Sequence, residues 1–379
     1  MAKKMKKVTS IVLNNFKNDS RVLKENISLQ NAGYDVLVVA LHEEPLKEFD
    51  EVQNIPIHRV KLKSRGWSKH KLIQLLKYME FIYRVVRQYK DSDILHCNDL
   101  SALPIGVIIK KFFNKDAKVV YDSHEYQVYR AGISKTISKL SYYLEKSLLP
   151  YCDTVIVVSK SIAQGYAKDY DIEEPELVLN TPNFTKIDKS DYFRKKYQIS
   201  NSEKIFLYQG RLSKFRGIEK LVDVFRIMPT NYHLVLMGHG EELKEFLSNI
   251  KNENIHIHES VPPYKILEYT SSADYGISLI EPISLSYEYC LPNKVFEYTM
   301  AGLPIIVSSL PEMKRFVEEN NVGIAVDFNN SIESLKNIFI EFSKQDYNKY
   351  KDNLNDTANK FNWEKQEQIL LNIYEKLVK

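Results

Sequence analysis

The sequence has few cysteines and no long apolar segment. Its three cysteines, Cys97, Cys152 and Cys290, lie far apart, so neither a disulfide framework nor a zinc cluster is expected. No apolar run reaches the roughly 18 residues needed to cross a bilayer. The first residues, MAKKMKKVTSIVL, are basic and then apolar, but no small-residue cleavage site follows them. We therefore expect a soluble cytosolic protein.

Apolar and aromatic residues, in contrast, are present in ordinary amounts. Hydrophobic residues make up 44% of the 379 positions, and 17 Phe and 25 Tyr provide ample core area, which excludes a disordered chain. This length is enough for two domains of roughly 150–200 residues each.

The net charge of +4 is unevenly distributed. Residues 1–150 contain 26 Lys and Arg against 16 Asp and Glu, a net charge of +10, which leaves −6 for the remainder. A basic half is typical of a surface that meets anionic partners such as lipid headgroups or nucleic acid, although scattered solvated charges give the same count. No nucleic-acid-binding motif accompanies the charge, so we expect no nucleic-acid partner.

Short β-branched runs alternate with longer helical patterns, which is typical of βαβ units with parallel sheets. In the first half we expect strands at 8–13, 36–40, 57–61, 94–96, 118–121 and 155–158, and helices at 20–31, 70–88, 103–112 and 134–149. In the second half we expect strands at 205–209, 233–237, 255–258, 275–279, 304–307 and 324–326, with helices starting near 217, 240, 264, 294, 311 and 331. The fold class is therefore α/β, with two doubly wound, Rossmann-like domains in tandem.

A polar segment at 180–202 separates the two sets and is interpreted as a linker. The expected domains are 1–185 and 203–362. In doubly wound sheets, ligands bind outside the carboxyl ends of the strands, so the site is expected in a cleft where those ends face each other.

Two glycine-containing segments follow strands of the second domain. The segment YQGRLSKFRG (208–217) places Arg211 and Arg216 in one loop, where two guanidinium groups could hold a diphosphate. The second segment, GHGE, begins at Gly238. The alternatives are an exposed basic turn for the first segment and a simple strand-to-helix turn for the second.

The segment PNKVFEYTMAGLP (292–304) begins and ends a helix. Glu297 lies one turn into this helix, on the side facing the strand ends, so its carboxylate could accept hydrogen bonds from vicinal hydroxyls. The alternative is an acid that is favoured near a helix N-terminus by the helix dipole.

Together these segments resemble the C-terminal domain of glycosyltransferase family 4, whose members are retaining enzymes of the GT-B fold. NDSRV (18–22), HCND (96–99) and DSHE (122–125) are similar to segments of the family's first domain, in the same order. The resemblance covers nearly the whole chain, and P-N-K-x-F-E-Y is its most specific element.

The resemblance implies roles for individual residues. Arg211 and Arg216 would hold the donor diphosphate and stabilise the leaving nucleotide. Glu297 matches the second glutamate of the family's E-x7-E pattern and would bind the ribose hydroxyls. The backbone at Val261 would meet the base, and His124 would contact the transferred sugar near its anomeric carbon.

Further donor contacts are expected from Gly210, Gly238, Asn293 and Lys294. Pro292 stands where the family has a glycine whose N–H points at phosphate, and proline has no N–H. Asn293, Lys294 and the helix N-terminus would replace that donor.

Tyr289 stands where the family has its first glutamate, a ligand of the sugar hydroxyls. Glu288 is adjacent and would substitute if the loop shifts, so both residues stay candidates for the donor site. The sugar cannot be identified from this loop.

On the acceptor side, the resemblance implies Asn18, Arg21 and Asp99. We expect Ser20 to cap the helix that starts there. Arg21 lies in the first turn, where an acid would suit the dipole better, so we expect it to have a charge partner, for which a substrate phosphate is one candidate.

Two segments, 105–118 and 134–151, mix lysines with large apolar residues. Each basic residue near an anionic bilayer contributes about 1 kcal/mol to binding. We expect the apolar residues to pack in the core and some of the lysines to contact the membrane.

The resemblance therefore implies a retaining glycosyltransferase, with an acceptor-binding domain at 1–185 and a final helix, 363–379, that packs back onto it. It would move a sugar from a UDP-linked donor to a glycan or lipid-linked acceptor in cell-surface polysaccharide biosynthesis. It would work at the inner face of the membrane and without metal or cofactor, since arginines and helix N-termini provide the positive charge. A nucleotide-sugar 2-epimerase and a non-catalytic nucleotide-sugar-binding partner are the alternatives.

Overall fold

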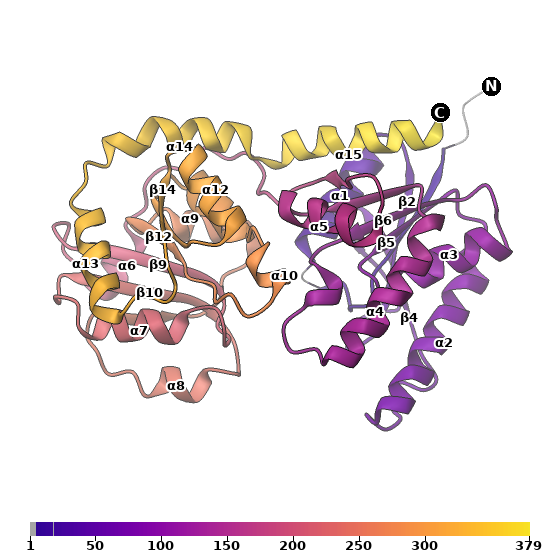
Figure 1. Cartoon of the computed structure of the whole chain (residues 1–379), viewed down its shortest axis with the longest axis horizontal. Coiled ribbons are helices and arrows are strands. Elements are labelled where there is room, and N and C mark those ends of the chain that lie inside the picture. The colour runs from indigo at the N-terminus through magenta and orange to yellow at the C-terminus, as the bar shows by residue number, and fades with distance from the viewer. Residues whose placement is uncertain (1–4, 18) are drawn as a thin grey trace. The chain divides into compact units, whose positions relative to one another are not determined.

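The computed structural model describes residues 5–17 and 19–379 and divides into two α/β units (Figure 1). The first unit comprises the chain up to residue 179 together with 367–379, and the second comprises 180–366. Each unit has one sheet with helices packed on it, so the predicted α/β class is confirmed.

The sheet of the first unit has eight strands in the order β3-β4-β2-β1-β5-β6-β7-β8. Neighbouring strands are parallel except β3 and β4, which form a hairpin. The strands are β1 (Lys7–Ile11), β2 (Asp35–Leu41), β3 (Phe49–Val52), β4 (Ile55–Val60), β5 (Ile94–Asn98), β6 (Lys118–Ser123), β7 (Thr154–Val157) and β8 (Glu176–Leu177). The prediction missed β3 and β8, because both are short edge strands without a buried apolar run.

The helices of this unit connect the parallel strands. They are α1 (Ser20–Asn31), α2 (Lys71–Tyr89), α3 (Leu103–Phe112), α4 (Lys135–Leu148) and α5 (Lys160–Tyr170), with short 3-10 turns η1 (Gln127–Tyr129) and η2 (Leu149–Tyr151). Strand β5 is buried along its whole length, as expected for a central strand covered on both faces. Asp19, rather than Ser20, caps α1, because its carboxylate accepts a hydrogen bond from the backbone N–H of Val22.

The apolar residues of α4 contradict the expectation that they pack in the core. Glu145 is the buried residue of this helix, and its carboxylate accepts hydrogen bonds from the hydroxyls of Tyr121, Tyr166 and Tyr170, each at 2.5 Å. Helix α4 is therefore held to the unit through a buried polar cluster. Its large apolar side chains point to solvent instead.

The sheet of the second unit has six parallel strands in the order β11-β10-β9-β12-β13-β14. They are β9 (Lys204–Arg211), β10 (Tyr232–His239), β11 (Ile255–His258), β12 (Tyr275–Ser278), β13 (Ile305–Ser308) and β14 (Gly323–Val326). The helices are α6 (Tyr192–Tyr197), α7 (Ile218–Arg226), α8 (Lys244–Ser248), α9 (Ile266–Thr270), α10 (Leu285–Glu288), α11 (Asn293–Met300), α12 (Pro311–Glu319), α13 (Ile332–Ser343) and α14 (Asn348–Lys360), with η3 (Pro263–Lys265) before α9.

The segment that was interpreted as a linker belongs to the second unit. It contains α6, whose Phe193 is fully buried and whose Arg194 pairs with Asp274 at 2.7 Å. Lys189 also pairs with Asp274, at 3.3 Å, so a buried ring and ion pairs to one aspartate hold this polar stretch, and none of them stands out by composition.

The final helix, α15 (Trp363–Val378), joins the first unit from residue 367 onward. Leu370, Ile373 and Tyr374 are buried there, and the Tyr374 hydroxyl lies 2.6 Å from His96 Nδ1. Lys376 pairs with Glu176 of β8 at 3.2 Å.

Candidate functional site

A pocket of about 300 Å³ lies at the carboxyl ends of β9 and β10 in the second unit. This is the edge of a parallel sheet at which ligands usually bind. The pocket is lined by Gly210 and Arg211 of β9, Gly238 of β10, Val261 after β11, and Asn293, Lys294 and Glu297 of α11. The structure thus brings together seven of the residues that sequence reasoning assigned to the donor.

The two glycines allow the ends of β9 and β10 to approach each other closely. A Cβ atom at Gly238 would overlap the carbonyl oxygen of Gly210, and Gly210 itself has φ +119, a conformation that other residues rarely adopt. Backbone atoms rather than side chains therefore form this wall of the pocket.

Glu297 is held in place by a residue that sequence reasoning missed. The side-chain amide of Gln209 donates to the Glu297 carboxylate at 2.5 Å, and the hydroxyl of Thr270 donates to Gln209 Oε1 at 2.7 Å. The available signal was a buried polar residue at the end of an otherwise apolar strand. This hydrogen bond holds one carboxylate oxygen of Glu297 at the pocket, and the role of Glu297 stays a prediction.

Lys294 places a buried amino group in the pocket. Its ammonium group lies 3.6 Å from the centre of the Tyr208 ring, and its side chain is 8% exposed. Burial lowers the pKa of Lys294 well below its usual range, and the charge of Arg216 lowers it further, while Glu297 opposes both effects. A bound anion would oppose both effects, because a nearby negative charge favours the charged form of a lysine.

Three other predicted donor residues lie outside the described lining of this pocket. The Arg216 guanidinium stacks over the ring of Tyr287 at 4.7 Å, on α10. Glu288 ends the same helix and Tyr289 follows it. Tyr287, the aromatic partner of Arg216, thus lies on α10. The roles of Glu288 and Tyr289 in binding the sugar stay predictions.

In the first unit, Asp122 at the end of β6 joins several predicted residues. Its carboxylate accepts hydrogen bonds from Arg21 Nη2 at 2.9 Å and Arg21 Nε at 3.1 Å, and His124 Nε2 lies 3.0 Å away. Arg21 also pairs with Glu25 at 3.1 Å and is 4% exposed. The charge partners expected for Arg21 are therefore the buried carboxylates of Asp122 and Glu25, rather than a substrate phosphate.

His124 is about one-fifth exposed and lies beside two carboxylates. Burial alone would lower its pKa, but the charges of Asp122 and Asp99 raise the pKa of His124 to about 10. Asp99 also accepts hydrogen bonds from the His124 backbone N–H at 3.1 Å and from the Gln127 amide at 2.6 Å. Asp99 thus organises the loop that carries His124. Asn18 lies outside the described residues.

Both halves of the chain match known families. Residues 27–180 match the model of Glycosyltransferase Family 4, and residues 207–364 match that of the glucosyltransferase 3-like C-terminal domain. The chain is a group 1 glycosyltransferase.

Relatives and solved structures agree with this assignment. The glycosyltransferase is 24% identical to the uncharacterised glycosyltransferase MJ1607 of Methanocaldococcus jannaschii over 78% of this chain and 77% of that protein. Sucrose-phosphate synthase of Thermosynechococcus elongatus has a similar structure, with a TM-score of 0.81, 17% identity and coverage of 98% and 99% of the two chains. Anabaena HepE, solved with UDP and glucose, gives a TM-score of 0.74 at 15% identity, with the same coverage. The predicted GT-B fold is thereby confirmed.

A possible cation-binding group in the glycosyltransferase lies next to Arg21. Glu25, His96 and Asp122 each offer a ligand atom, all within 4.8 Å of one another. The guanidinium of Arg21 contacts both carboxylates, so an added cation would compete with these ion pairs. The sequence-based expectation that no metal is required stays a prediction.

Among the helices of the described chain, none combines the length and apolarity that crossing a membrane requires.

The raised pKa of His124 predicts a pH dependence of stability. A group whose pKa rises from 6.5 to about 10 on folding stabilises the folded state fully below pH 6.5, and this contribution is lost as the pH approaches 10. We expect the melting temperature to fall between pH 7 and 10, and to fall less in His124→Gln. Thermal unfolding across this range measures both slopes. His256→Gln is the control, because the pKa of His256 is about 4 and its titration lies below the window. Equal slopes for wild type and His124→Gln would contradict the assignment.

Proposed function

We propose that this glycosyltransferase moves a sugar from a UDP-linked donor to a glycan or lipid-linked acceptor in cell-surface polysaccharide biosynthesis. The observation that carries the proposal is the pocket in which the Glu297 carboxylate, bonded to Gln209, lies near the buried ammonium of Lys294. A fixed carboxylate suits vicinal ribose hydroxyls, and a buried cation suits a diphosphate.

The proposed placement of the donor follows from this chemistry. The diphosphate would lie by Lys294 and Arg211, the ribose at Glu297, and the base at the backbone of Val261, all of which line one pocket. Arg216 would add positive charge from the neighbouring segment. That HepE, which shares the fold, was solved with UDP and glucose supports uridine as the nucleoside.

The proposed reaction retains the configuration at the anomeric carbon by attack from the same face. The bond from the anomeric carbon to the diphosphate oxygen breaks, a bond to the acceptor oxygen forms, and the acceptor proton passes to the leaving phosphate. The positive charges of Lys294, Arg211 and Arg216 stabilise the leaving diphosphate, so we propose no metal or cofactor. His124 is assigned to the transferred sugar, and Asp99 to the acceptor side.

We also propose that the enzyme works in the cytoplasm and binds peripherally to the inner face of the membrane. The net charge of +10 in its first 150 residues supports an anionic surface as its partner.

A thermal-shift panel of UDP-, GDP-, dTDP- and ADP-sugars tests the donor site. We expect UDP-sugars to raise the melting temperature of the wild type. Glu297→Ala should weaken this binding by roughly 10- to 150-fold, because hydrogen bonds to a charged group are lost. Glu341→Ala removes an exposed acid of α13 and should bind like the wild type. If none of the sugars shifts the melting temperature, the donor site is wrongly assigned.

The same donor distinguishes the reaction classes. Incubation of the active nucleotide-sugar with acceptor should release free UDP together with a glycosylated product. An isomerised donor would indicate an epimerase instead, and binding without turnover would indicate a non-catalytic partner.

A further inference from the structure

Helix α2 of the first unit exposes an unusually regular apolar stripe. Leu72, Leu75, Leu76, Met79 and Tyr83 follow the spacing of one helix face, and their exposed fractions are 66%, 54%, 52%, 53% and 62%. A stripe with this spacing normally packs against a core. Here the opposite side of the helix makes the core contacts, so the stripe is exposed to solvent.

Helix α4 exposes a second apolar stripe in the same unit. Ile137, Leu140, Tyr143 and Leu144 are 40–70% exposed, because the helix is held through Glu145 on its other side. Both helices contact α3, and both lie in the lower part of this unit in Figure 1. Trp67, which precedes α2, is 55% exposed. We call the two stripes and Trp67 together the α2–α4 surface.

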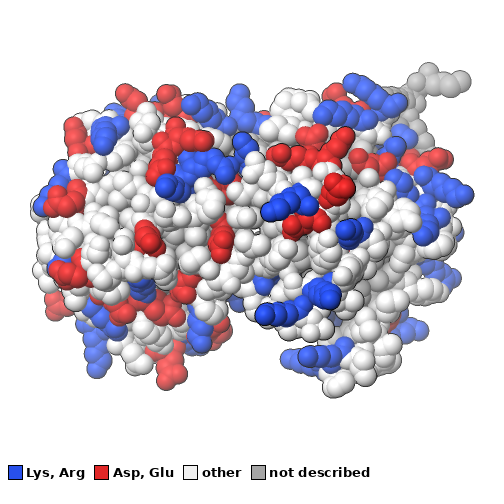
Figure 2. Space-filling view, viewed as in Figure 1, with Lys and Arg blue, Asp and Glu red and all other residues white. Residues whose placement is uncertain are grey.

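Positive charge surrounds the α2–α4 surface. Residues 61–79 contain five Lys and one Arg but no Asp or Glu. The exposed ammonium groups of Lys69, Lys71, Lys135 and Lys139 have no acidic partner within the described part of the chain. Figure 2 shows basic side chains over the lower part of this unit with few acidic ones among them.

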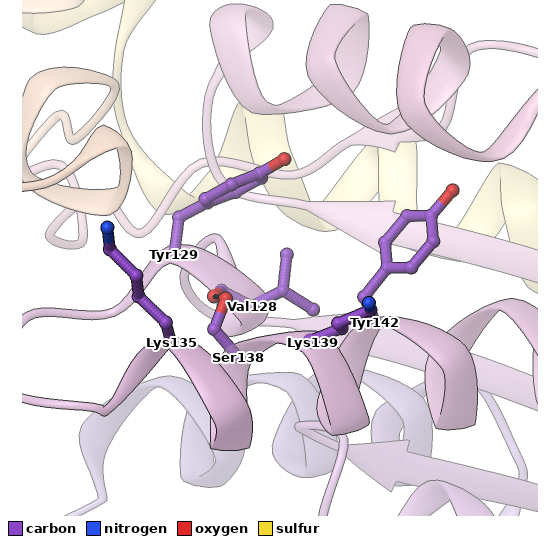
Figure 3. Close-up of a pocket in the computed structure, with 6 residues that line it drawn as sticks. All are labelled: Val128, Tyr129, Lys135, Ser138, Lys139 and Tyr142. Carbon is purple, nitrogen blue, oxygen red and sulfur yellow. Dashed lines mark hydrogen bonds between the residues drawn. The ribbon is translucent and has the colours of Figure 1, made fainter.

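Two of these lysines border a small pocket beside the stripe of α4. The pocket has a volume of about 290 Å³ and is lined by Val128, Tyr129, Lys135, Ser138, Lys139 and Tyr142. In Figure 3, Lys135 and Tyr142 lie on either side of it, with Tyr129 across from the helix. Two ammonium groups beside a hollow with hydroxyls suit the phosphate of a lipid headgroup.

The charge of the surface decides between possible occupants. If two copies met through this surface, their lysine-rich rims would face each other, which like-charge repulsion disfavours. An anionic bilayer offers phosphates for the lysines and acyl chains for the leucines, and Trp prefers this interface. We propose that the α2–α4 surface docks the enzyme on an anionic bilayer, with its apolar side chains inserted and its lysines at the headgroups.

This inference deepens the proposed function and rests on it, because docking on a membrane would bring the enzyme to a lipid-linked acceptor. It differs from the sequence-based expectation, in which only lysines met the membrane. Apolar insertion by α2, a helix that the sequence did not single out, is the new element.

Vesicle sedimentation tests the docking. Full-length protein should bind vesicles of phosphatidylcholine with phosphatidylglycerol at least on the order of 10-fold more tightly than vesicles of phosphatidylcholine alone. The triple variant Leu72→Ser, Leu76→Ser, Leu140→Ser should lose on the order of 10-fold or more in affinity for the anionic vesicles. A matched control carries Ile227→Ser and Tyr264→Ser, exposed apolar residues of the second unit, and should bind like the wild type.

Tryptophan fluorescence provides a second readout, because the sequence has two tryptophans and Trp363 is buried. Anionic vesicles should shift the emission to shorter wavelength in the wild type, and Trp67→Phe should abolish this shift. If the wild-type protein does not bind anionic vesicles, the docking proposal is overturned. A wild-type dimer that the triple variant converts to monomer would also overturn it, because the surface would then be an interface between copies.

The test separates the two proposals. Donor binding in the thermal-shift panel requires no vesicles, so loss of vesicle binding with intact donor binding would refute the docking alone. Vesicle binding without any nucleotide-sugar binding would refute the donor site and leave the docking in place.

Discussion

Replacing Lys294 by methionine is expected to lower kcat/KM by on the order of 10²–10³ and to leave the folded protein at least as stable as the wild type. This is the loss of kcat/KM expected when one preorganised positive charge is removed from the place where negative charge develops in the transition state. The expected gain or neutrality in stability follows because methionine fills a similar volume without a buried ammonium.

The two effects have the same physical origin. In the free protein, Lys294 is buried against Tyr208 and close to the charge of Arg216, and burial and Arg216 both lower its pKa. A buried cation that is poorly compensated in the free enzyme costs folding free energy. In the proposed reaction, the same group in its charged form would stabilise the negative charge that develops on the leaving diphosphate more strongly than an exposed lysine would.

Chemical denaturation and steady-state kinetics of the same preparations measure both quantities. Lys314→Met, which removes an exposed lysine of α12, should change neither activity nor stability appreciably. If Lys294→Met is clearly less stable and its activity only follows the folded fraction, then Lys294 is a structural residue and the diphosphate assignment fails.

The parallel strands could be predicted because burial on both faces requires continuous apolar runs. β5 and β12 are buried at every position, and their positions in the sequence are unambiguous. β3 has the sequence FDEV and pairs with β4 through a tight turn in which Gln53 and Asn54 have positive φ. No buried face marks such a strand in advance.

The grouping of donor candidates in one pocket could be predicted because they follow strand ends in one unit, and parallel strands bring those ends to one edge. Arg21 could not be interpreted in this way. Its partner Asp122 is 101 residues away, and no local pattern indicates a buried ion pair over that separation. Gln209 was missed for a similar reason, because its role depends on Glu297, 88 residues further on.

Helix α4 shows a different limit of sequence reasoning. An amphipathic pattern predicts a helix with an apolar face and a polar face. It does not show which of the two faces packs against the rest of the unit. Burial of Glu145 against three tyrosine hydroxyls reversed the expected orientation. The tyrosines come from β6 and α5, so this polar cluster forms only in the folded chain.

Replacing Asp122 by asparagine is expected to lower the free energy of unfolding by about 3–5 kcal/mol, the loss that follows removal of one partner from a buried ion pair. Arg21 would then keep Glu25 as its partner, while His124 would lose its nearest carboxylate. Burial raises the pKa of Asp122, but the charges of Arg21 and His124 hold it well below its usual range. The wild-type carboxylate is therefore ionised throughout the physiological range, and the loss should be seen at neutral pH.

Urea denaturation of Asp122→Asn, Arg21→Met, the double variant and a control measures this coupling. Asp93→Asn removes a partly exposed carboxylate that pairs with Lys6 and should cost less than about 1 kcal/mol. Arg21→Met combined with Asp122→Asn should cost less than the two single losses added together, because no uncompensated guanidinium remains. NMR titration of Asp122→Asn should also show a lower pKa for His124, since its largest stabilising charge is gone. Additive losses and an unchanged pKa of His124 would mean that Asp122 packs beside these residues without governing their charge.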